Sequence, residues 1–198
     1  MAIHDIETMN IISERLHAID PAVVIYGEGW AAMAPAFPEE QIALKVNTHK
    51  LDKIGAFSDN IRDAVRGPLG CENAGFMDGV AGNKENIEFG IAGGVEHPQV
   101  SVERWTNNPL QHVSYVSCHD DHCLRDRLEE ATDATEKERL AMVKLAQTAV
   151  YTSQGIPFIF AGEELYRHKQ GVKNSYNKPD SINAIDWTYK TTYKDLVD

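Results

Sequence analysis

The sequence predicts an α/β protein that forms part of a (β/α) barrel, with four parallel strands and the helices that connect them. Short apolar runs alternate along the chain with segments of helical periodicity, and this order is typical of parallel βαβ units. Each apolar run is followed by polar side chains, which are Glu28 and Trp30, Ser58 and Asp59, His119 and Asp120, and Glu163 and Glu164. The functional residues of a (β/α) barrel lie at the carboxyl ends of its strands, and four strands are half of its eight.

The strands are expected over residues 22–26, 54–58, 112–118 and 156–162. These runs are rich in β-branched and aromatic residues, as buried strands are. Pro157 stands near the start of the last run, where a strand tolerates proline. No glycine-rich phosphate loop follows any of the four runs, so the sequence does not favour nucleotide binding.

Helices are expected over residues 5–19, 59–66 and 133–154. Asp20-Pro21 and Gly67-Pro68 end the first two. In the third, apolar residues recur every three or four positions and form one stripe, at Leu140, Val143, Ala146 and Val150. Residues 70–108 are glycine-rich and are expected to form a long connection that holds a short helix.

Composition limits the classes of function. The chain has 198 residues, enough for one domain with a sizeable core, and its 30 acidic and 19 basic residues give a formal charge of −11. Nucleic acids and anionic membranes bind clustered basic residues, so this charge argues against both as partners. The three cysteines are an odd number and do not favour a disulfide framework.

The run "CHDDHC", residues 118–123, places potential metal ligands at consecutive positions. If the preceding strand continues into the run, successive side chains face opposite ways and the ligands do not converge. Structural zinc sites usually join a closely spaced cysteine pair to a second, distant ligand pair, which is not evident in this chain. We therefore expect buried thiols and an inward, hydrogen-bonded histidine here, with a zinc site as the alternative.

The segment "VVIYGEGW", residues 23–30, places Glu28 directly after an apolar strand, between two glycines and close to Trp30. Glycine allows a ligand to approach the backbone closely. A carboxyl group near an indole is partly shielded from water, an environment that suits a general acid. The plainer alternative is a glutamate in an exposed strand–helix loop.

Several segments together resemble type I pullulanases, the α-1,6-specific branch of glycoside hydrolase family 13 in the α-amylase superfamily. These segments are "IHDIETMN", "NTHKL…AFSDNIRDAVRG", "YVSCHDDH" and "GIPFIFAGEELYRHKQGVKNSYNKPDSINAIDW", while "YGEGW" and "VSCHDDH" are similar to the third and fourth signature regions of the superfamily. The resemblance covers nearly the whole chain and is weakest around residues 70–105. It implies that residues 1–198 are the C-terminal half of a glycoside hydrolase catalytic barrel, a partial TIM (β/α)8 barrel with strands 5 to 8 and their helices, truncated at both ends.

By this resemblance Glu28 is the general acid/base that protonates the leaving glycosidic oxygen. Asp120 is implied as the second carboxylate, which orients sugar hydroxyls and stabilises the oxocarbenium-like transition state. One departure is Asp121, where the family usually has asparagine, so a charge is added beside the site.

The resemblance also implies residues that bind the substrate. His119 is expected to form a hydrogen bond to the sugar in the same subsite, and Trp30 to stack on a glucose ring on the leaving-group side. The segment "NSYNKPD", with Asn174, Tyr176 and Asp180, is similar to the pullulanase loop that lines the donor subsites.

The nucleophile of the family is not expected in this chain. In relatives the nucleophilic aspartate ends the fourth barrel strand in a run similar to "GFRFD", and a segment like "IHDIETMN" follows almost at once. The chain begins "MAIHDIETMN", so its first residue is expected to align just past the nucleophile. Without that group no covalent glycosyl intermediate forms, and the isolated chain is expected to be nearly inactive. A half barrel with open sheet edges is also expected to pair with the missing N-terminal half or to self-associate.

The resemblance therefore predicts a pullulanase-type glycosidase that hydrolyses α-1,6 branch links in pullulan, starch or glycogen with retention of configuration. The alternative is a non-catalytic glucan-binding or complementing half barrel. The expected partner is an α-glucan oligosaccharide or polysaccharide. No cofactor is expected: some relatives bind calcium, but no loop with the spacing of a calcium site is evident here. Localisation stays open, with the cytoplasm as default, because any signal peptide would lie upstream of Met1.

Overall fold

The structure is a computed structural model that describes residues 4–31, 33–34, 36–69 and 75–198. Cys71 and the other residues of 70–74 lie outside the described part. The chain divides into two compact units. The first unit comprises Met1–Asp59, Glu88–Ser114 and Ser153–Ile156, and the second unit comprises Asn60–Ile87, Tyr115–Thr152 and Pro157–Asp198.

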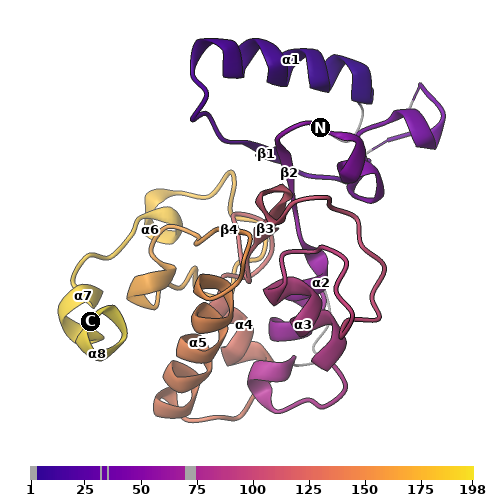
Figure 1. Cartoon of the computed structure of the whole chain (residues 1–198). Coiled ribbons are helices and arrows are strands. Elements are labelled where there is room, and N and C mark those ends of the chain that lie inside the picture. The colour runs from indigo at the N-terminus through magenta and orange to yellow at the C-terminus, as the bar shows by residue number, and fades with distance from the viewer. Residues whose placement is uncertain (1–3, 32, 35, 70–74) are drawn as a thin grey trace. The chain divides into compact units, whose positions relative to one another are not determined.

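A four-stranded sheet in the order β1-β2-β3-β4 belongs to the first unit, and its last strand ends at the unit boundary (Figure 1). The strands are β1 (Ile25–Gly27), β2 (Ile54–Phe57), β3 (His112–Ser114) and β4 (Ile156–Pro157). The register is parallel, with Gly27 opposite Ala56 and Phe57 opposite Val113. The segments that follow β1 and β2 therefore leave the sheet at the same edge.

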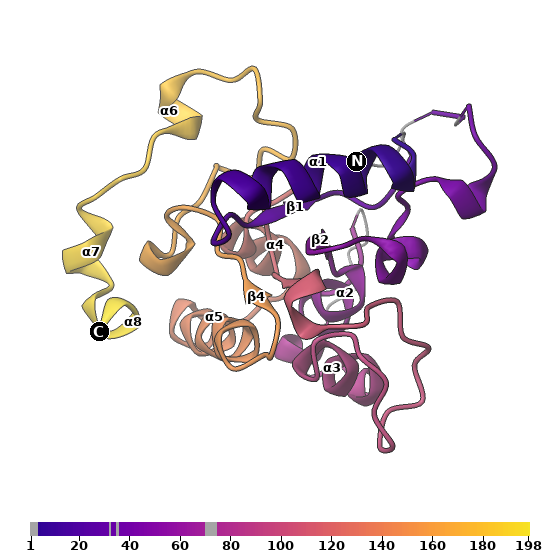
Figure 2. The ribbon, with the colours of Figure 1, turned by 45° about the horizontal axis from the view of Figure 1, so that its top comes forward.

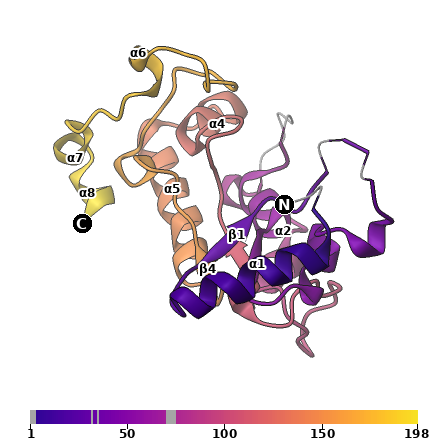
Figure 3. The same ribbon diagram turned by 90° about the horizontal axis from the view of Figure 1, so that it is seen from above.

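Helix α1 (Ile6–Ile19) begins at Asp5, whose carboxylate oxygen accepts a 2.7 Å hydrogen bond from the Thr8 amide. Such an N-cap satisfies one of the amides that the first turn leaves unpaired. Met9 of α1 belongs to a buried cluster with Leu51 and Ile54, which packs the helix against β2. Figure 3 shows α1 running beside β1.

A second apolar cluster of the first unit is formed by Ala56, Phe89 and Trp105. The Trp105 ring stacks on His112 with 5.2 Å between the ring centroids. Burial lowers the pKa of His112 to about 3, so this imidazole is neutral and serves the core.

The main core of the second unit lies between helices α2 (Asp59–Arg66), α4 (Leu124–Ala131) and α5 (Glu136–Tyr151). Helices α4 and α5 lie side by side (Figure 2). Their buried residues include Leu124, Leu128, Val143, Ala146 and Val150. The stripe predicted for the longest helix is thus confirmed, with Leu140 partly buried beside the cluster.

The remaining elements are short. They are η1 (Glu39–Gln41), η2 (Lys45–Lys50), η3 (Phe76–Asp78), α3 (Lys84–Ile91), η4 (Pro109–Gln111), η5 (Glu163–Leu165), α6 (Asp180–Asn183), α7 (Tyr189–Thr192) and α8 (Lys194–Val197). Among the described residues, no helix has both the length and the apolar character needed to cross a membrane.

The predicted α/β class with parallel strands is confirmed, but the predicted strands are too long. The run 112–118 pairs only as far as Ser114, and the run 156–162 forms a strand of two residues. The carbonyl of Val116 accepts a hydrogen bond from Arg66 Nη1 at 3.3 Å, so a side chain takes a position that a neighbouring strand would fill. Helix α4 was not predicted: the sequence interpretation of this region stopped at the potential ligands of residues 118–123.

Shortening a buried leucine of the second unit is expected to weaken its core. Leu128 is fully buried, and Leu128→Ala should lower the free energy of unfolding by about 2–5 kcal/mol, because the cavity forms between packed helices. Leu110 is 64% exposed, so Leu110→Ala serves as the matched control and should change stability by less than about 0.5 kcal/mol. Urea unfolding monitored by circular dichroism measures both, and equal effects would contradict the assigned core.

Candidate active site

In the first unit, Glu28 and Trp30 follow β1 directly. Glu28 is half-buried and Trp30 is 38% exposed, so both side chains remain accessible from solvent. Gly29 between them is buried, and a Cβ atom there would lie 2.7 Å from the amide nitrogen of Lys45. The glycine at this position is therefore needed for the close approach of Lys45.

Lys45 fixes the segment after β1 through two contacts. Its amide donates a 2.7 Å hydrogen bond to the carbonyl of Gly29, and its Nζ lies 2.9 Å from Oδ2 of Asp59. Asp59 follows β2, so one lysine joins the segments that leave these neighbouring strands at the same sheet edge. This arrangement holds the backbone beside Glu28.

In the second unit, His119 and Asp120 lie next to one another on the loop before α4. Nε2 of His119 is 3.4 Å from Oδ1 of Asp120, and the two side chains are 69% and 58% exposed. Both can therefore meet a ligand that approaches from solvent. The predicted pair is brought together by the loop itself.

The next residue of the loop, Asp121, has a left-handed backbone conformation with φ of 60°. Asparagine and aspartate tolerate this conformation better than other non-glycine residues, which fits either residue at this position. Oδ2 of Asp121 lies 3.0 Å from Nη2 of Arg66, a side chain that is almost fully buried. The charge of Asp121 is thus compensated by a buried guanidinium.

The other members of "CHDDHC" have hydrogen-bonding partners within the second unit. Nε2 of His122 is 3.0 Å from the carbonyl of Gly171, and Cys123 Sγ donates to Oδ2 of Asp126 at 3.0 Å. Burial raises the pKa of Cys123 to about 12, which keeps it a thiol. Cys118 is half-buried rather than buried, so the expectation of two buried thiols is only partly met.

The loop with Asn174, Tyr176 and Asp180 also belongs to the second unit. All three residues are exposed, and Tyr176 is 83% exposed. Asn183 supports the loop, because its Nδ2 donates to the carbonyls of Ser175 at 2.7 Å and Lys178 at 2.9 Å. An exposed tyrosine on a supported loop suits stacking against a sugar ring.

Glu163 is a buried carboxyl group whose environment the sequence did not reveal. Its Oε2 accepts a hydrogen bond from Ser117 Oγ, and its Oε1 has no hydrogen-bond partner among the described residues. Burial raises the pKa of Glu163 to about 7, against the opposing effects of Ser117 and Arg66. The position after a predicted strand was a signal, but burial depends on residues that are distant in sequence.

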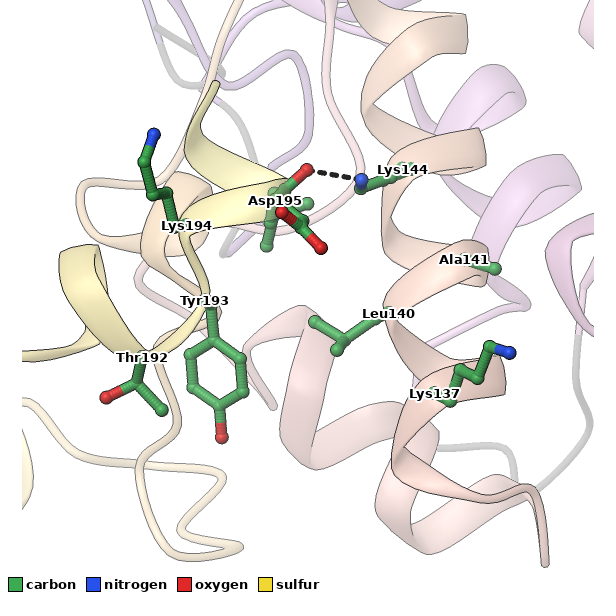
Figure 4. Close-up of a pocket in the computed structure, with 9 residues that line it drawn as sticks. Lys137, Leu140, Ala141, Lys144, Thr192, Tyr193, Lys194 and Asp195 are labelled. Carbon is green, nitrogen blue, oxygen red and sulfur yellow. Dashed lines mark hydrogen bonds between the residues drawn. The ribbon is translucent and has the colours of Figure 1, made fainter.

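Each unit has a pocket, and none of the predicted site residues lines either of the two pockets. One, of about 620 Å³, lies in the first unit beside residues 21–25, 51–53 and 107–111. The other, of about 400 Å³, lies in the second unit between α5 and the segment of α7 and α8 (Figure 4). There the Nζ of Lys144 donates to the backbone carbonyl of Asp195.

No protein-family profile matches the chain. The pullulanase of Bacillus subtilis (strain 168) is 34% identical over 199 residues, which cover all of this chain and 27% of that protein. The crystal structure of the pullulanase from Paenibacillus barengoltzii in complex with maltohexaose and α-cyclodextrin is 43% identical, with a TM-score of 0.93. That match covers the whole of this chain and 30% of the other. The chain is a pullulanase homologue.

A second pullulanase structure, that from B. subtilis strain 168 complexed with maltose, matches 99% of the chain at 34% identity with a TM-score of 0.93. The described fold is thus a four-stranded parallel α/β half barrel that corresponds to part of the barrel in pullulanases. The chain spans between a quarter and a third of the length of these relatives.

Replacing Glu163 is expected to change how stability depends on pH. The folded state holds the proton of Glu163 up to about pH 7, above the ordinary pKa of 4.5, so the folded state binds more protons than the unfolded state between these values. The contribution of Glu163 to the free energy of unfolding is therefore fully present below pH 4.5. It is lost as the pH rises to about 7, which lowers the free energy of unfolding by about 3 kcal/mol.

Glu163→Gln should remove most of this loss, because the amide stays neutral at every pH. Its free energy of unfolding should exceed that of the parent chain at pH 8 and approach it at pH 5. Glu14→Gln, at an exposed glutamate of α1, is the control and should leave the pH profile unchanged. Denaturant titrations from pH 5 to 8 measure the free energy of unfolding. If it depends on pH in the same way for Glu163→Gln and the parent, the Glu163 carboxyl group does not titrate near pH 7.

Proposed function

We propose that the chain provides the acid/base part of a retaining α-1,6-glucan hydrolase of pullulanase type. The observation that carries this proposal is the likeness to pullulanases along the whole chain, together with the maltooligosaccharides named in their solved complexes. In this proposal the four strands correspond to strands 5 to 8 of the catalytic barrel.

Glu28 is proposed as the general acid/base and Asp120 as the carboxylate that stabilises the transition state. In a retaining reaction the acid donates its proton to the leaving glycosidic oxygen while a separate nucleophile attacks the sugar carbon. The former acid then removes a proton from the water that releases the sugar. The half-buried position of Glu28 after β1 and the exposure of Asp120 support these roles, because both can reach a bound ligand.

The remaining predicted residues are proposed to bind glucan. Trp30 and Tyr176 offer aromatic faces, and His119, Asn174 and Asp180 offer hydrogen-bonding groups for sugar hydroxyls. A neutral ligand needs no basic surface, so the net charge of −11 agrees with such a substrate.

The nucleophile is proposed to come from elsewhere. The 198 residues contain no run similar to "GFRFD", and neither Glu28 nor Asp120 corresponds to the nucleophile in the resemblance. The 198-residue polypeptide is therefore expected to be inactive or nearly so on its own.

A complementing or glucan-binding half barrel is the second candidate. Strand β1 stands at the edge of the sheet order and pairs there with β2 alone among the described strands. Val24 and Tyr26 at this edge are 59% and 44% exposed. A strand at the edge of a sheet can accept a further strand, so a polypeptide with the other strands of a pullulanase barrel is the proposed partner.

The decisive assay measures reducing sugar released from pullulan by the chain, with and without a polypeptide that carries the preceding half of a pullulanase barrel. We expect release only from the mixture. In the mixture, Glu28→Gln should lower the rate by roughly 10²–10⁴-fold, since it removes the general acid. Glu40→Gln, at an exposed residue of η1, should leave the rate unchanged. Activity of the chain alone would overturn the argument for a missing nucleophile.

Glucan binding without turnover is tested at Tyr176. Tyr176→Ala should weaken binding of maltohexaose by about tenfold, because it removes an exposed aromatic face, whereas Tyr176→Phe should keep the affinity. Tyr151→Ala, at a 57% exposed tyrosine of α5, is the control. Isothermal titration calorimetry gives the affinities, and equal binding by the parent and Tyr176→Ala would remove Tyr176 from the site.

A further inference from the structure

Lys169 is a lysine without solvent exposure in the second unit. Its Nζ donates to the backbone carbonyl of His119 at 3.2 Å, to that of Asp121 at 3.1 Å, and to Oγ of Ser175 at 3.1 Å. An ammonium group has three donors, so these contacts use all of them. Burial lowers the pKa of Lys169, while Cys123 and Asp126 act in the opposite direction.

Asp126 holds the backbone around this lysine in place. Its Oδ2 accepts from the amide of Lys169 at 2.6 Å, and its Oδ1 accepts from the amide of Gly171 at 3.1 Å. Asp126 is itself buried and lies in the first turn of α4. The ammonium group therefore projects from a backbone that is fixed to the start of that helix.

The contacts of Lys169 reach the two segments of the second unit that carry proposed sugar-binding residues. On one side Nζ binds the carbonyls of His119 and Asp121, the residues before and after Asp120, so it fixes the backbone on both sides of this carboxylate. On the other side it binds Ser175, which is buried between the exposed residues Asn174 and Tyr176. Because Ser175 is held in the interior by this hydrogen bond, Asn174 and Tyr176 on either side of it are exposed to solvent.

We propose that Lys169 is a positioning residue for glucan binding, which sets the spacing between the segment 119–121 and the segment 174–176 through one ammonium group. This inference rests on the proposed function, because it assumes that both segments bind the same glucan. Lys169 itself touches no substrate, since its three donors are used within the protein and its side chain has no exposed surface.

The test uses Lys169→Met, which keeps the length of the side chain and removes the three donors. We expect maltohexaose to bind about tenfold more weakly, because two loops lose their common anchor. Ser175→Ala should weaken binding about threefold by removing a single hydrogen bond, and Ser175→Thr should restore it because the hydroxyl returns. Lys190→Met, at an exposed lysine of α7, is the matched control and should bind like the parent.

Hydrogen exchange measured by mass spectrometry separates positioning from general loss of structure. In Lys169→Met, peptides that cover 118–123 and 173–178 should exchange faster, while the α5 peptide 136–151 should exchange as in the parent. Uniformly faster exchange would mean that Lys169 supports the whole unit, and unchanged exchange in both loops would mean that it supports neither, so each result overturns the inference.

The binding data distinguish this inference from the proposed function. If the parent chain does not bind maltohexaose, glucan binding fails, while the exchange data still decide whether Lys169 holds the two segments. If the parent binds and Lys169→Met or Ser175→Ala binds equally well, the positioning role is wrong and the proposed function stands.

Discussion

The loop between β3 and α4 depends on two buried cations that donate to its backbone carbonyls. Arg66 binds the carbonyls of Val116 and His122, and Lys169 binds those of His119 and Asp121. A loop has no regular ladder to satisfy its carbonyls, and each buried carbonyl without a donor costs free energy comparable to a lost hydrogen bond. The two side chains supply donors to these carbonyls, and only that of Val116 lies within the run 112–118 that was predicted as a strand.

Burying two cations is costly unless their charges are compensated. The loop provides one compensating group, because Asp121 pairs with Arg66. The start of α4 provides the other in Asp126, although this carboxylate binds the amide of Lys169 rather than its ammonium group. Glu163 is a third acid, but burial raises its pKa to about 7, so below that pH it is largely neutral and does not compensate either cation. The conformation of the loop thus depends on charge balance as well as on packing.

The sequence predicted those elements that local patterns determine. The period of apolar residues located α1 and α5, and the Gly67-Pro68 pair located the end of α2. The resemblance to pullulanases, which rests on several segments, agrees with matches to pullulanases that cover the whole chain. Strand lengths were wrong at β3 and β4, because pairing depends on which donors reach a carbonyl, and Arg66 is 50 residues away from Val116. Helix α4 was missed because it directly follows residues 118–123. That run was interpreted from its potential metal ligands, and the periodicity of the residues after it was not used.

The sequence also did not predict which charged side chains are buried. Lys169 lies in the run "RHKQG", which is polar and gives no indication that this lysine is enclosed. Arg62 and Arg66 share one face of α2 because they are four positions apart, and that face is buried together with Ile61 and Val65. The pattern of α2 alone would place arginines in solvent. Only the tertiary structure shows that Arg62 reaches the hydroxyl of Tyr115 at 2.6 Å.

Glu28, Asp120 and Tyr176 share one local arrangement, in which a half-buried or exposed side chain stands beside a fixed backbone. Glu28 is followed by Gly29, whose carbonyl is bound by the amide of Lys45. Asp120 stands between two carbonyls bound by Lys169, and Tyr176 follows Ser175, whose hydroxyl is bound by the same group. A flexible loop loses conformational entropy when it binds a ligand, and a fixed backbone reduces that loss. Within each unit these contacts order the backbone from which the side chains project, and none of them requires a bound ligand.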